Sequence, residues 1–361
     1  MRSRAAVCHA FGGPHAVEDV LLREPRGDEV LVRVEACAVC HSDVSAAEGA
    51  WGGELPAVYG HEAAGTVVEA GAGVARAQVG DAVVVTLIRA CGRCRSCLRG
   101  EPALCLDDGP ADSPLSLPGG RRVVQGMRTA AFARHVLVHE SQVVPVPPDV
   151  PRVTASLLGC GVLTGVGAAV RTAAIEDGAR VVVLGAGGVG LSCVQGARLA
   201  GAATIVAVDP VPAKREAAAA VGATHTVDAA SADVVGAVRE VAGADGADYV
   251  LVATGARGAV QTALELLARG GTAVLVGMPP SGSTVEIDPT ELAHHGRRIV
   301  GSKLGSARPD ADIPWLVDLY RDGRLELDGL VSGTFPLERL DEAMAEVRAG
   351  AALRNVVVPH G

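Results

Sequence analysis

Four cysteines lie close together in the sequence, at Cys91, Cys94, Cys97 and Cys105. Four thiolates in one loop can surround a zinc ion tetrahedrally and leave no coordination position open, which is the arrangement of structural zinc sites. An iron–sulfur cluster also takes four cysteines, and surface cysteines without a metal are a third interpretation. In a reducing compartment this spacing indicates a metal before disulfides, so we predict a structural zinc site.

A second group of possible metal ligands is scattered along the chain. Cys40 lies in CAVCHSD, His61 in YGHEAAG and Cys160 in LLGCGVLTG. Two cysteines and a histidine with one open position would form a catalytic zinc site, but their spacing alone does not show that they meet. Each residue taken singly is more often structural. Cys37 forms a CxxC pair with Cys40, and we interpret it as a buried strand cysteine.

A glycine pattern indicates dinucleotide binding. The sequence GAGGVG follows the apolar run VVVL, precedes a helix-like run, and contains Gly185, Gly187, Gly188 and Gly190. Such a turn lets a pyrophosphate approach the backbone at a helix N-terminus. Asp209 ends the next strand-like run, and no arginine follows it directly. A carboxylate there accepts hydrogen bonds from ribose hydroxyls and repels a 2′-phosphate, which favours NAD over NADP. The alternative is a glycine turn that binds nothing.

The elements that must position these residues change character near residue 160. The first part alternates apolar and polar residues, as in EVLVRVEACAVC, and predicts strands separated by glycine turns. The stretch 107–120 is rich in Pro, Gly, Asp and Ser and predicts a loop that shapes the cleft entrance. Later, short apolar runs alternate with helix-like runs, which is typical of a parallel sheet covered on both faces. We therefore expect a β-rich domain over 1–161, a doubly wound domain over 162–299, and a segment over 300–361 that returns to the first domain.

Composition excludes several classes of function. The 361 residues include 32 Lys and Arg against 41 Asp and Glu, a net charge of -9 that disfavours nucleic acid and anionic lipid as partners. Apolar residues make up 49% of the chain, enough for a large core. The longest uncharged window, 153–170, is broken by four glycines, so we predict no membrane span. The first residues lack an apolar signal region, and we expect a cytoplasmic protein.

Several motifs in the same order resemble the zinc-dependent medium-chain alcohol dehydrogenase family. They are CHSD (40–43), GHE (60–62), the four-cysteine loop (91–105), GCGVLTG (159–165), GAGGVG (185–190), VGMPP (276–280) and LRNVVV (353–358). The resemblance runs nearly end to end. It implies an α/β protein with a GroES-like β-rich catalytic domain that holds two zinc ions and a Rossmann domain that binds NAD.

The resemblance also implies roles around the catalytic zinc. Cys40, His61 and Cys160 correspond to its ligands, and Asp43 to the residue that orients the histidine ring. Glu62 lies near the metal in similar enzymes. Ser42 matches the hydroxyl that takes the alcohol proton, while Ser45 stands where many relatives place the histidine that ends the proton relay. Since serine has no base that titrates near neutral pH, water or another group must complete the relay.

Further positions correspond to contacts with coenzyme and substrate. The resemblance places His41 and Arg354 at the coenzyme pyrophosphate, Lys214 near the adenosine ribose, and Thr164 and Val189 at the nicotinamide. Val276 and Met278, in VGMPP, belong to the same coenzyme region. The residues that line the substrate cleft are Trp51, Leu87 and Met278, an apolar set that suits aliphatic or aromatic primary alcohols.

These features predict an NAD-dependent alcohol dehydrogenase or aldehyde reductase that assembles as a homodimer or homotetramer. A close alternative is a thiol-dependent (mycothiol- or glutathione-type) formaldehyde dehydrogenase that oxidises an S-hydroxymethyl adduct, which RACGRCRSCLRGEPALC also resembles. A rate that requires added thiol would distinguish the two. A third interpretation is a non-catalytic protein that binds NAD and zinc. Such a protein would be expected to lose ligands or Ser42, and all of them are present.

Overall fold

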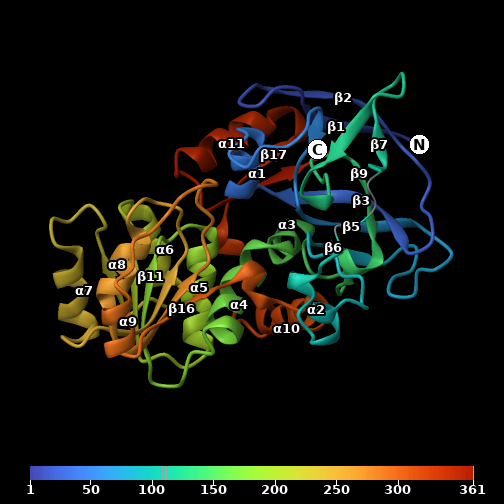
Figure 1. Ribbon diagram of the computed structural model, residues 1–361. Helices are drawn as coiled ribbons and strands as arrows, with labels where there is room; N and C mark the ends of the chain where they lie inside the picture. The colour runs from blue at the N-terminus through green and yellow to red at the C-terminus, as the bar shows by residue number, and fades with distance from the viewer. Residues whose placement is uncertain (108, 110–111, 361) are drawn as a thin grey trace. The chain divides into compact units, whose positions relative to one another are not determined.

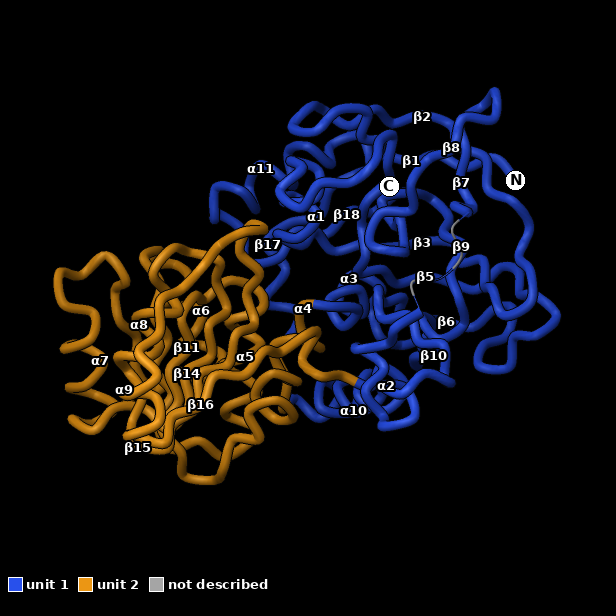
Figure 2. The backbone as a smooth tube through the Cα atoms, viewed as in Figure 1, with its two compact units in different colours: residues 1–160, 308–323, 327–361 blue, residues 161–307, 324–326 orange. Residues whose placement is uncertain are grey.

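The computed structural model describes residues 1–107, 109 and 112–360, and its backbone forms two compact units (Figures 1 and 2). Unit 1 contains Met1–Cys160, Arg308–Gly323 and Leu327–Gly361. Unit 2 contains Gly161–Ala307 and Arg324–Glu326. The expected segment 300–361 is therefore divided: residues 300–307 and 324–326 belong to unit 2, and the rest to unit 1.

Unit 1 is built from short strands in two sheets. One is a closed barrel with the order β1-β2-β7-β8-β4, and the other has the order β10-β6-β5-β3-β18-β17, with β9 also paired to β3. The strands are β1 Arg2–Cys8, β2 His15–Leu22, β3 Glu29–Ala38, β4 Ala57–Val58, β5 Glu62–Ala70, β6 Ala82–Val85, β7 Leu115–Ser116, β8 Arg122–Gln125, β9 His135–His139, β10 Val143–Pro145, β17 Val331–Pro336 and β18 Arg354–Val358.

Strand β3 is the centre of unit 1. Its alternating sequence predicts a strand with one face in solvent, yet most of its residues are buried. The reason is that β3 pairs with three strands, β5, β9 and β18. Val356 of β18 lies opposite Ala38, so β18 extends the sheet of β3 from a segment more than 300 residues later in the sequence. The helices of this unit are α1 His41–Ala47, α2 Arg95–Leu98, α3 Arg152–Ser156, α10 Pro309–Arg321 and α11 Leu340–Arg348.

Unit 2 is a parallel sheet with helices, as the alternating runs predict. Its strand order is β13-β12-β11-β14-β15-β16, which is the order 3-2-1-4-5-6 of a Rossmann fold. The strands are β11 Arg180–Leu184, β12 Thr204–Val208, β13 His225–Val227, β14 Ala247–Val252, β15 Leu267–Leu275 and β16 Arg298–Gly301. The helices are α4 Gly161–Gly167, α5 Gly188–Leu199, α6 Pro212–Ala220, α7 Val234–Ala242, α8 Ala259–Leu266 and α9 Pro289–His294.

Two local expectations differ from the structure. One of the helix-like runs, AVQTALELLARGG at 259–271, is a helix only to Leu266, because Leu267 is buried and begins β15, where it pairs with Ala247 of β14. The loop predicted over 107–120 contains the short strand β7, and Asp108, Pro110 and Ala111 in that loop lie outside the described residues.

Each helix in the described part of the chain is too short or too polar to cross a membrane by itself. The segments Arg152–Gly159 and Gly161–Thr172 meet that measure only when they are taken together, and the chain bends by 52° where they join.

Candidate metal centres and coenzyme-binding motif

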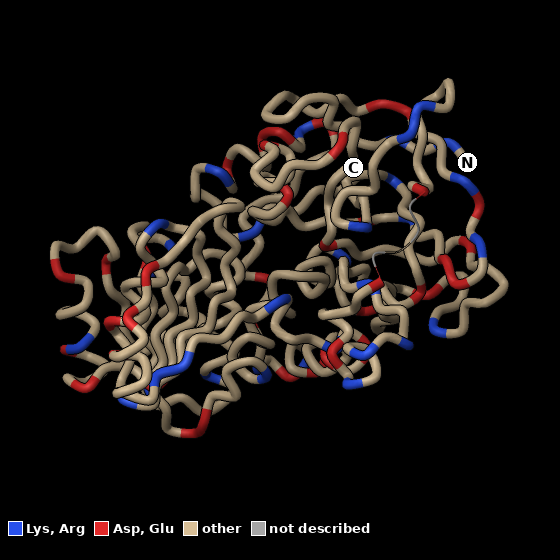
Figure 3. The backbone as a smooth tube through the Cα atoms, viewed as in Figure 1, with Lys and Arg blue, Asp and Glu red and all other residues tan. Residues whose placement is uncertain are grey.

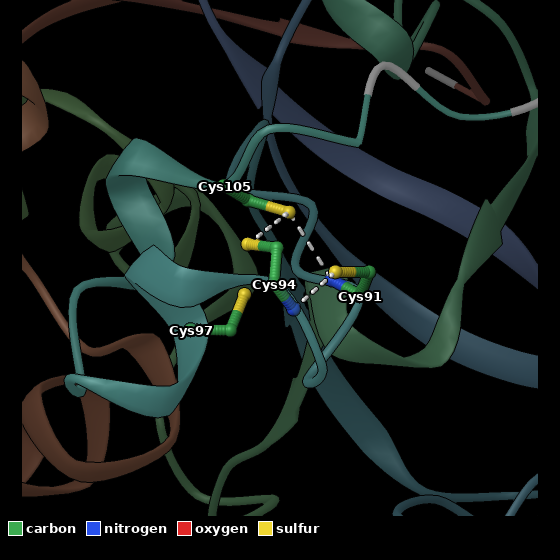
Figure 4. Close-up of side chains that lie close together, drawn as sticks. All are labelled: Cys91, Cys94, Cys97 and Cys105. Atoms are coloured by element: carbon green, nitrogen blue, oxygen red, sulfur yellow. Dashed lines mark hydrogen bonds between the residues drawn. The ribbon is translucent and has the colours of Figure 1, made fainter.

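The four cysteines of the predicted structural site come together in unit 1. The sulfur atoms of Cys91, Cys94, Cys97 and Cys105 all lie within 4.8 Å of one another and point toward a common centre (Figure 4). Zinc–sulfur bonds of about 2.3 Å place the sulfur atoms of a tetrahedral site about 3.8 Å apart. The distance from Cys94 Sγ to Cys105 Sγ is 4.0 Å, so the set fits a four-thiolate zinc site.

Backbone N–H groups surround these sulfur atoms. The Cys91 N–H donates to Cys105 Sγ at 3.3 Å, and the Cys94 N–H donates to Cys91 Sγ at 3.4 Å. Contacts of this kind, chiefly from the Cys97 N–H, lower the pKa of Cys94 to about 6. Burial and the neighbouring Cys94 raise the pKa of Cys97 to about 12. The backbone N–H groups therefore stabilise the thiolate of Cys94, which is the form of cysteine that binds a metal.

The scattered residues of the second predicted site also meet in unit 1. The ligand atoms of Cys40, His61, Glu62 and Cys160 lie within 4.8 Å of one another, and all four residues are buried. Cys40 follows β3 and immediately precedes α1, and His61 immediately precedes β5. Since Ala38 lies opposite Glu62 in the β3–β5 pair, the pairing brings Cys40 and His61 to the same end of the two strands.

Cys160 reaches this end because the residue before it is a glycine. A Cβ atom on Gly159 would lie 2.7 Å from the Val85 carbonyl oxygen and 3.0 Å from the Glu62 Cα. Only a residue without a side chain allows the chain to pass this close to β5 and β6. The glycine before Cys160 in the sequence LLGCG thus has a packing reason that the sequence alone did not reveal.

Asp43 organises the donors of the second site. Its Oδ1 atom accepts hydrogen bonds from His61 Nδ1 at 2.8 Å and from the Gly60 N–H at 3.0 Å, and its Oδ2 accepts from the Cys40 N–H at 3.1 Å. One buried carboxylate therefore fixes the position of two donors. The bond to Nδ1 leaves Nε2 of the ring for the metal side, which is the arrangement of oriented zinc histidines.

Glu62 and Arg354 form a buried ion pair beside these donors. Arg354 Nη2 donates to Glu62 Oε2, and the other carboxylate oxygen of Glu62 lies 4.0 Å from His61 Nε2. Arg354 comes from β18, so the C-terminal segment supplies the counter-charge. The resemblance had assigned Arg354 to the coenzyme pyrophosphate and did not anticipate this pairing.

The pKa values in the second site reflect mutual dependence among its groups. Burial raises the pKa of Glu62 to about 7, against the effect of Arg354. A hydrogen bond from Cys160 lowers the pKa of Cys40 well below its usual value in spite of burial. Burial lowers the pKa of His61, but Asp43 and Cys40 together raise it well above its usual value. Without a metal, protons lie between these neighbouring donors, and a bound divalent cation would displace them. The site therefore fits a zinc ion held by Cys40, His61 and Cys160.

The glycine motif of unit 2 forms the turn between β11 and α5. A Cβ atom on Gly190 would lie 1.8 Å from the Gly185 carbonyl oxygen, so helix and strand pack too closely for any side chain. A Cβ atom on Gly187, by contrast, would meet nothing within 4 Å. Gly187 precedes the first residue of α5, where backbone N–H groups lack partners within the helix. The turn therefore leaves open space at a helix N-terminus, which suits a pyrophosphate.

Asp209 lies at the end of β12, as predicted, and is buried. Its Oδ2 accepts a hydrogen bond from the Ala186 N–H at 2.8 Å, and its Oδ1 accepts one from the Val211 N–H at 2.9 Å. The sequence analysis found no arginine directly after Asp209, but Arg215, six residues later, donates to the Asp209 carbonyl oxygen at 2.7 Å. Pro212, which is typical of the first position of a helix, was a sequence signal that α6 begins there and therefore that Arg215 lies in its first turn, close to Asp209.

The remaining predicted residues are distributed between the units. In unit 1, Ser42, Ser45, Trp51 and Leu87 are half-buried, and His41 is exposed. In unit 2, Thr164 and Val276 are buried, Val189 and Lys214 are half-buried, and Met278 is 66% exposed. Trp51 packs against the apolar core of unit 1. Both metal-ligand clusters thus belong to unit 1 and the glycine turn to unit 2.

Charges alternate in sign along both units. Positions of Lys and Arg are interspersed with those of Asp and Glu along the backbone (Figure 3). Local pairs, such as Glu62 with Arg354 and Arg215 with Asp228, therefore set the electrostatics near the candidate sites.

Sequence comparisons agree with this architecture. Residues 26–148 match the alcohol dehydrogenase GroES-like domain, and residues 188–322 match the zinc-binding dehydrogenase family. The chain is 36% identical to the alcohol dehydrogenase class-3 of Cereibacter sphaeroides, over 99% of this chain and 100% of that protein. It is 35% identical to the S-(hydroxymethyl)glutathione dehydrogenase of Paracoccus denitrificans, with the same two coverages.

Solved structures are also similar over nearly the whole chain. The benzyl alcohol dehydrogenase of Acinetobacter calcoaceticus has a TM-score of 0.93 and 32% identity, with 99% of each chain covered. A zinc-binding dehydrogenase of Sinorhizobium meliloti 1021, whose structure is bound to NADP, has a TM-score of 0.83 and 31% identity, covering 99% of this chain and 100% of that one. The chain therefore belongs to the zinc-dependent medium-chain alcohol dehydrogenase family, whose GroES-like and Rossmann folds its two units adopt.

Proposed function

We propose that this chain is a zinc-dependent, NAD-linked alcohol dehydrogenase that also reduces aldehydes. The observation that carries the proposal is the buried set of Cys40, His61 and Cys160, with Asp43 bound to the far side of the histidine ring. Three protein donors leave one zinc position for substrate, whereas the four cysteines of the 91–105 loop leave none. We therefore assign two zinc ions to each chain, one catalytic and one structural.

We assign proton transfer and ligand exchange to other residues of this site. Cys40, His61 and Cys160 would hold a zinc ion that would lower the pKa of an alcohol hydroxyl, and a bound nicotinamide would supply the hydride chemistry. Ser42, at the start of α1, accepts the hydroxyl proton, and Ser45, nearly one turn along the same helix, passes it toward water. Glu62, paired with Arg354, keeps a second carboxylate beside the ligands and assists exchange of the fourth ligand.

Coenzyme binding is assigned to the glycine turn and the residues that follow it. The N-terminus of α5 takes the pyrophosphate and Asp209 takes the adenosine ribose, which selects NAD. The other coenzyme contacts are His41, Thr164, Val189, Lys214, Val276, Met278 and Arg354. Trp51, Leu87 and Met278 carry apolar side chains at substrate positions, so we propose aliphatic or aromatic primary alcohols as substrates.

A thiol-dependent formaldehyde dehydrogenase is the second candidate. The observation that favours it is the full-length similarity to an alcohol dehydrogenase class-3 and to an S-(hydroxymethyl)glutathione dehydrogenase. In that case the oxidised alcohol is the adduct of formaldehyde with glutathione or mycothiol. The same zinc donors serve both reactions, so the metal site does not separate them.

Two measurements test these proposals together. NADH formation is followed across a panel of primary alcohols, each with and without formaldehyde plus a low-molecular-weight thiol, and zinc per chain is counted on the same sample. Activity on free alcohols supports the first function, and activity only with formaldehyde and thiol supports the second. Coenzyme binding without turnover in either direction would leave the non-catalytic interpretation and contradict both.

We also propose a homodimer or homotetramer that works in the cytoplasm. The support for a reducing compartment is that none of the nine cysteines, all of which lie within the described residues, is paired in a disulfide. Light scattering coupled to gel filtration gives the assembly directly.

A further inference from the structure

Two aspartates occupy neighbouring positions at the predicted coenzyme end of the parallel sheet. Asp209 follows β12 and Asp228 follows β13, and the two strands pair in parallel with Val208 opposite Val227. The ladder continues beyond the strands, because the Asp209 N–H donates to the Val227 carbonyl at 3.2 Å and the Ala229 N–H donates to the Asp209 carbonyl at 3.4 Å. Asp228 is therefore the lateral neighbour of the residue assigned to the ribose. Ligands of such sheets bind at the carboxyl ends of the strands.

Arg215 bridges these two positions. Its Nη1 donates to the Asp209 carbonyl oxygen at 2.7 Å, and its Nη2 lies 3.3 Å from Asp228 Oδ2. The Arg215 side chain is only 18% exposed, whereas that of Asp228 is 46% exposed. The arginine that lies nearest to Asp209 is thus occupied by one backbone oxygen and one carboxylate.

This arrangement bears on the choice between NAD and NADP. The two coenzymes differ by a 2′-phosphate on the adenosine ribose, and an arginine near the end of this strand is what accommodates that phosphate in NADP enzymes. The Asp209 carboxylate is held in place by the N–H groups of Ala186 and Val211, and each of its oxygens keeps a lone pair for a ribose hydroxyl. A 2′-phosphate would bring nearly two negative charges toward that carboxylate.

We propose that Asp228 is a second determinant of coenzyme choice, because it holds Arg215 away from a 2′-phosphate and adds a second negative charge beside Asp209. The inference rests on the proposed function, since it concerns the coenzyme of the same site. It goes beyond Asp209 itself, because it assigns the selection to a pair of residues that no sequence pattern singles out.

Binding of adenosine fragments tests the proposal without turnover or zinc. Calorimetry at one fixed ionic strength measures the Kd of adenosine 2′,5′-bisphosphate and of 5′-AMP for the full chain and for Asp228→Asn. We expect the Kd of the bisphosphate to fall about tenfold in the variant, which is about 1.4 kcal/mol, while the Kd of 5′-AMP stays within about twofold. Asp245→Asn, an exposed acid of the same unit, is the matched control and leaves both values unchanged.

A second substitution tests the part assigned to Arg215. In the wild-type background, Arg215→Gln should change the Kd of the bisphosphate little, because the arginine is already occupied. In the Asp228→Asn background it should remove most of the gain. An unchanged ratio of the two Kd values in Asp228→Asn overturns the proposal, and a gain that survives Arg215→Gln in full overturns the part assigned to Arg215. Failure of the wild-type chain to bind 5′-AMP or NAD would instead contradict the proposed function, so the two failures are distinguishable.

Discussion

The two cysteine clusters of unit 1 use the same kind of donor in opposite settings. The cluster of Cys91, Cys94, Cys97 and Cys105 comes from one loop, is half-buried, and has backbone N–H groups donating to its sulfur atoms. The cluster of Cys40, His61 and Cys160 comes from three distant segments, is buried, and has carboxylates beside it at Asp43 and Glu62. The difference teaches that the number of donors and their surroundings, rather than the presence of thiolates, separate a closed site from a reactive one.

The two clusters also differ in which parts of the fold are needed to assemble their donors. The loop cluster needs only its own short sequence to bring its sulfur atoms together. The buried cluster depends on the β3–β5 pairing, on the close passage at Gly159 and on Asp43, so the fold has to be complete before its donors converge. Substitutions should therefore separate the two clusters by activity, by stability and by metal content.

The largest expected effect is on catalysis at the buried cluster. Cys160→Ala removes one of three zinc donors, and the loss of several kcal/mol of Lewis-acid stabilisation corresponds to a fall in kcat/KM of about a thousandfold. The melting temperature should change little, because the surrounding core remains. Initial rates and thermal unfolding of the same preparation measure both quantities.

Cys37→Ala is the matched control for that variant. Cys37 is buried on β3, three residues before Cys40, and donates weakly to the Ala38 carbonyl at 3.8 Å. The Cys37→Ala variant should keep its zinc and most of its activity, and its free energy of unfolding should fall by about 1 kcal/mol. A loss of activity in Cys37→Ala as large as that in Cys160→Ala would show that the donor set has been misassigned.

The next effect is on stability at the loop cluster. Cys94→Ala opens a site whose metal binding contributes directly to folding, so we expect the melting temperature to fall by about 5 °C or more. The folded fraction should retain turnover, because the catalytic donors are untouched. Scanning calorimetry and active-site titration measure the two effects, and an inactive variant with an unchanged melting temperature would contradict the division of roles.

Asp43→Asn weakens the buried cluster without removing a donor. The amide can replace only part of the bonding to His61, Gly60 and Cys40. Loss of such an orienting carboxylate typically costs about 10- to 100-fold in metal affinity or activity. Competition with a zinc chelator measures the affinity. Asp81→Asn, which loses only a contact with the Gln78 N–H on a surface turn, should leave zinc affinity unchanged.

The smallest expected effect is on stability, when one glycine next to each cluster is replaced by alanine. Gly159→Ala places a Cβ atom 2.7 Å from the Val85 carbonyl oxygen and should cost about 2–3 kcal/mol and displace Cys160. A Cβ atom on Gly92 would have no atom within 4 Å, so the destabilisation of Gly92→Ala comes only from its φ of 71° and should be about 1 kcal/mol. Denaturant unfolding gives both values. A larger cost at Gly92 would mean that the loop, and not the buried cluster, is the tightly packed one.

The two clusters also differ in how far the sequence alone could predict them. The loop cluster could be assigned from spacing alone, because its four ligands are local. The glycine turn and Asp209 could be placed because a strand, a turn and a helix follow one another along the chain. The proposed catalytic donors could not be joined by spacing, since Cys40 and His61 come close through the β3–β5 pairing and Cys160 through the close passage at Gly159. Resemblance to a family grouped them, and the structure supplies the physical reason.

Other features depended on contacts that no pattern carries. The Arg354–Glu62 pair joins β18 to β5, and Arg215 reaches Asp228 from a different element. Residues 300–301 belong to unit 2 because they end β16, the edge strand of the parallel sheet. In each case the partner was set by tertiary packing.

Zinc content of three proteins tests the central claim most directly. Metal analysis of the wild type, Cys160→Ala and Cys94→Ala, each purified with zinc present, counts ions per folded chain. Two independent centres predict about two zinc ions in the wild type and about one in each variant. The lone zinc of Cys94→Ala should support turnover, while that of Cys160→Ala should not. A single zinc in the wild type, or loss of both ions in Cys160→Ala, would contradict the account of two separate centres.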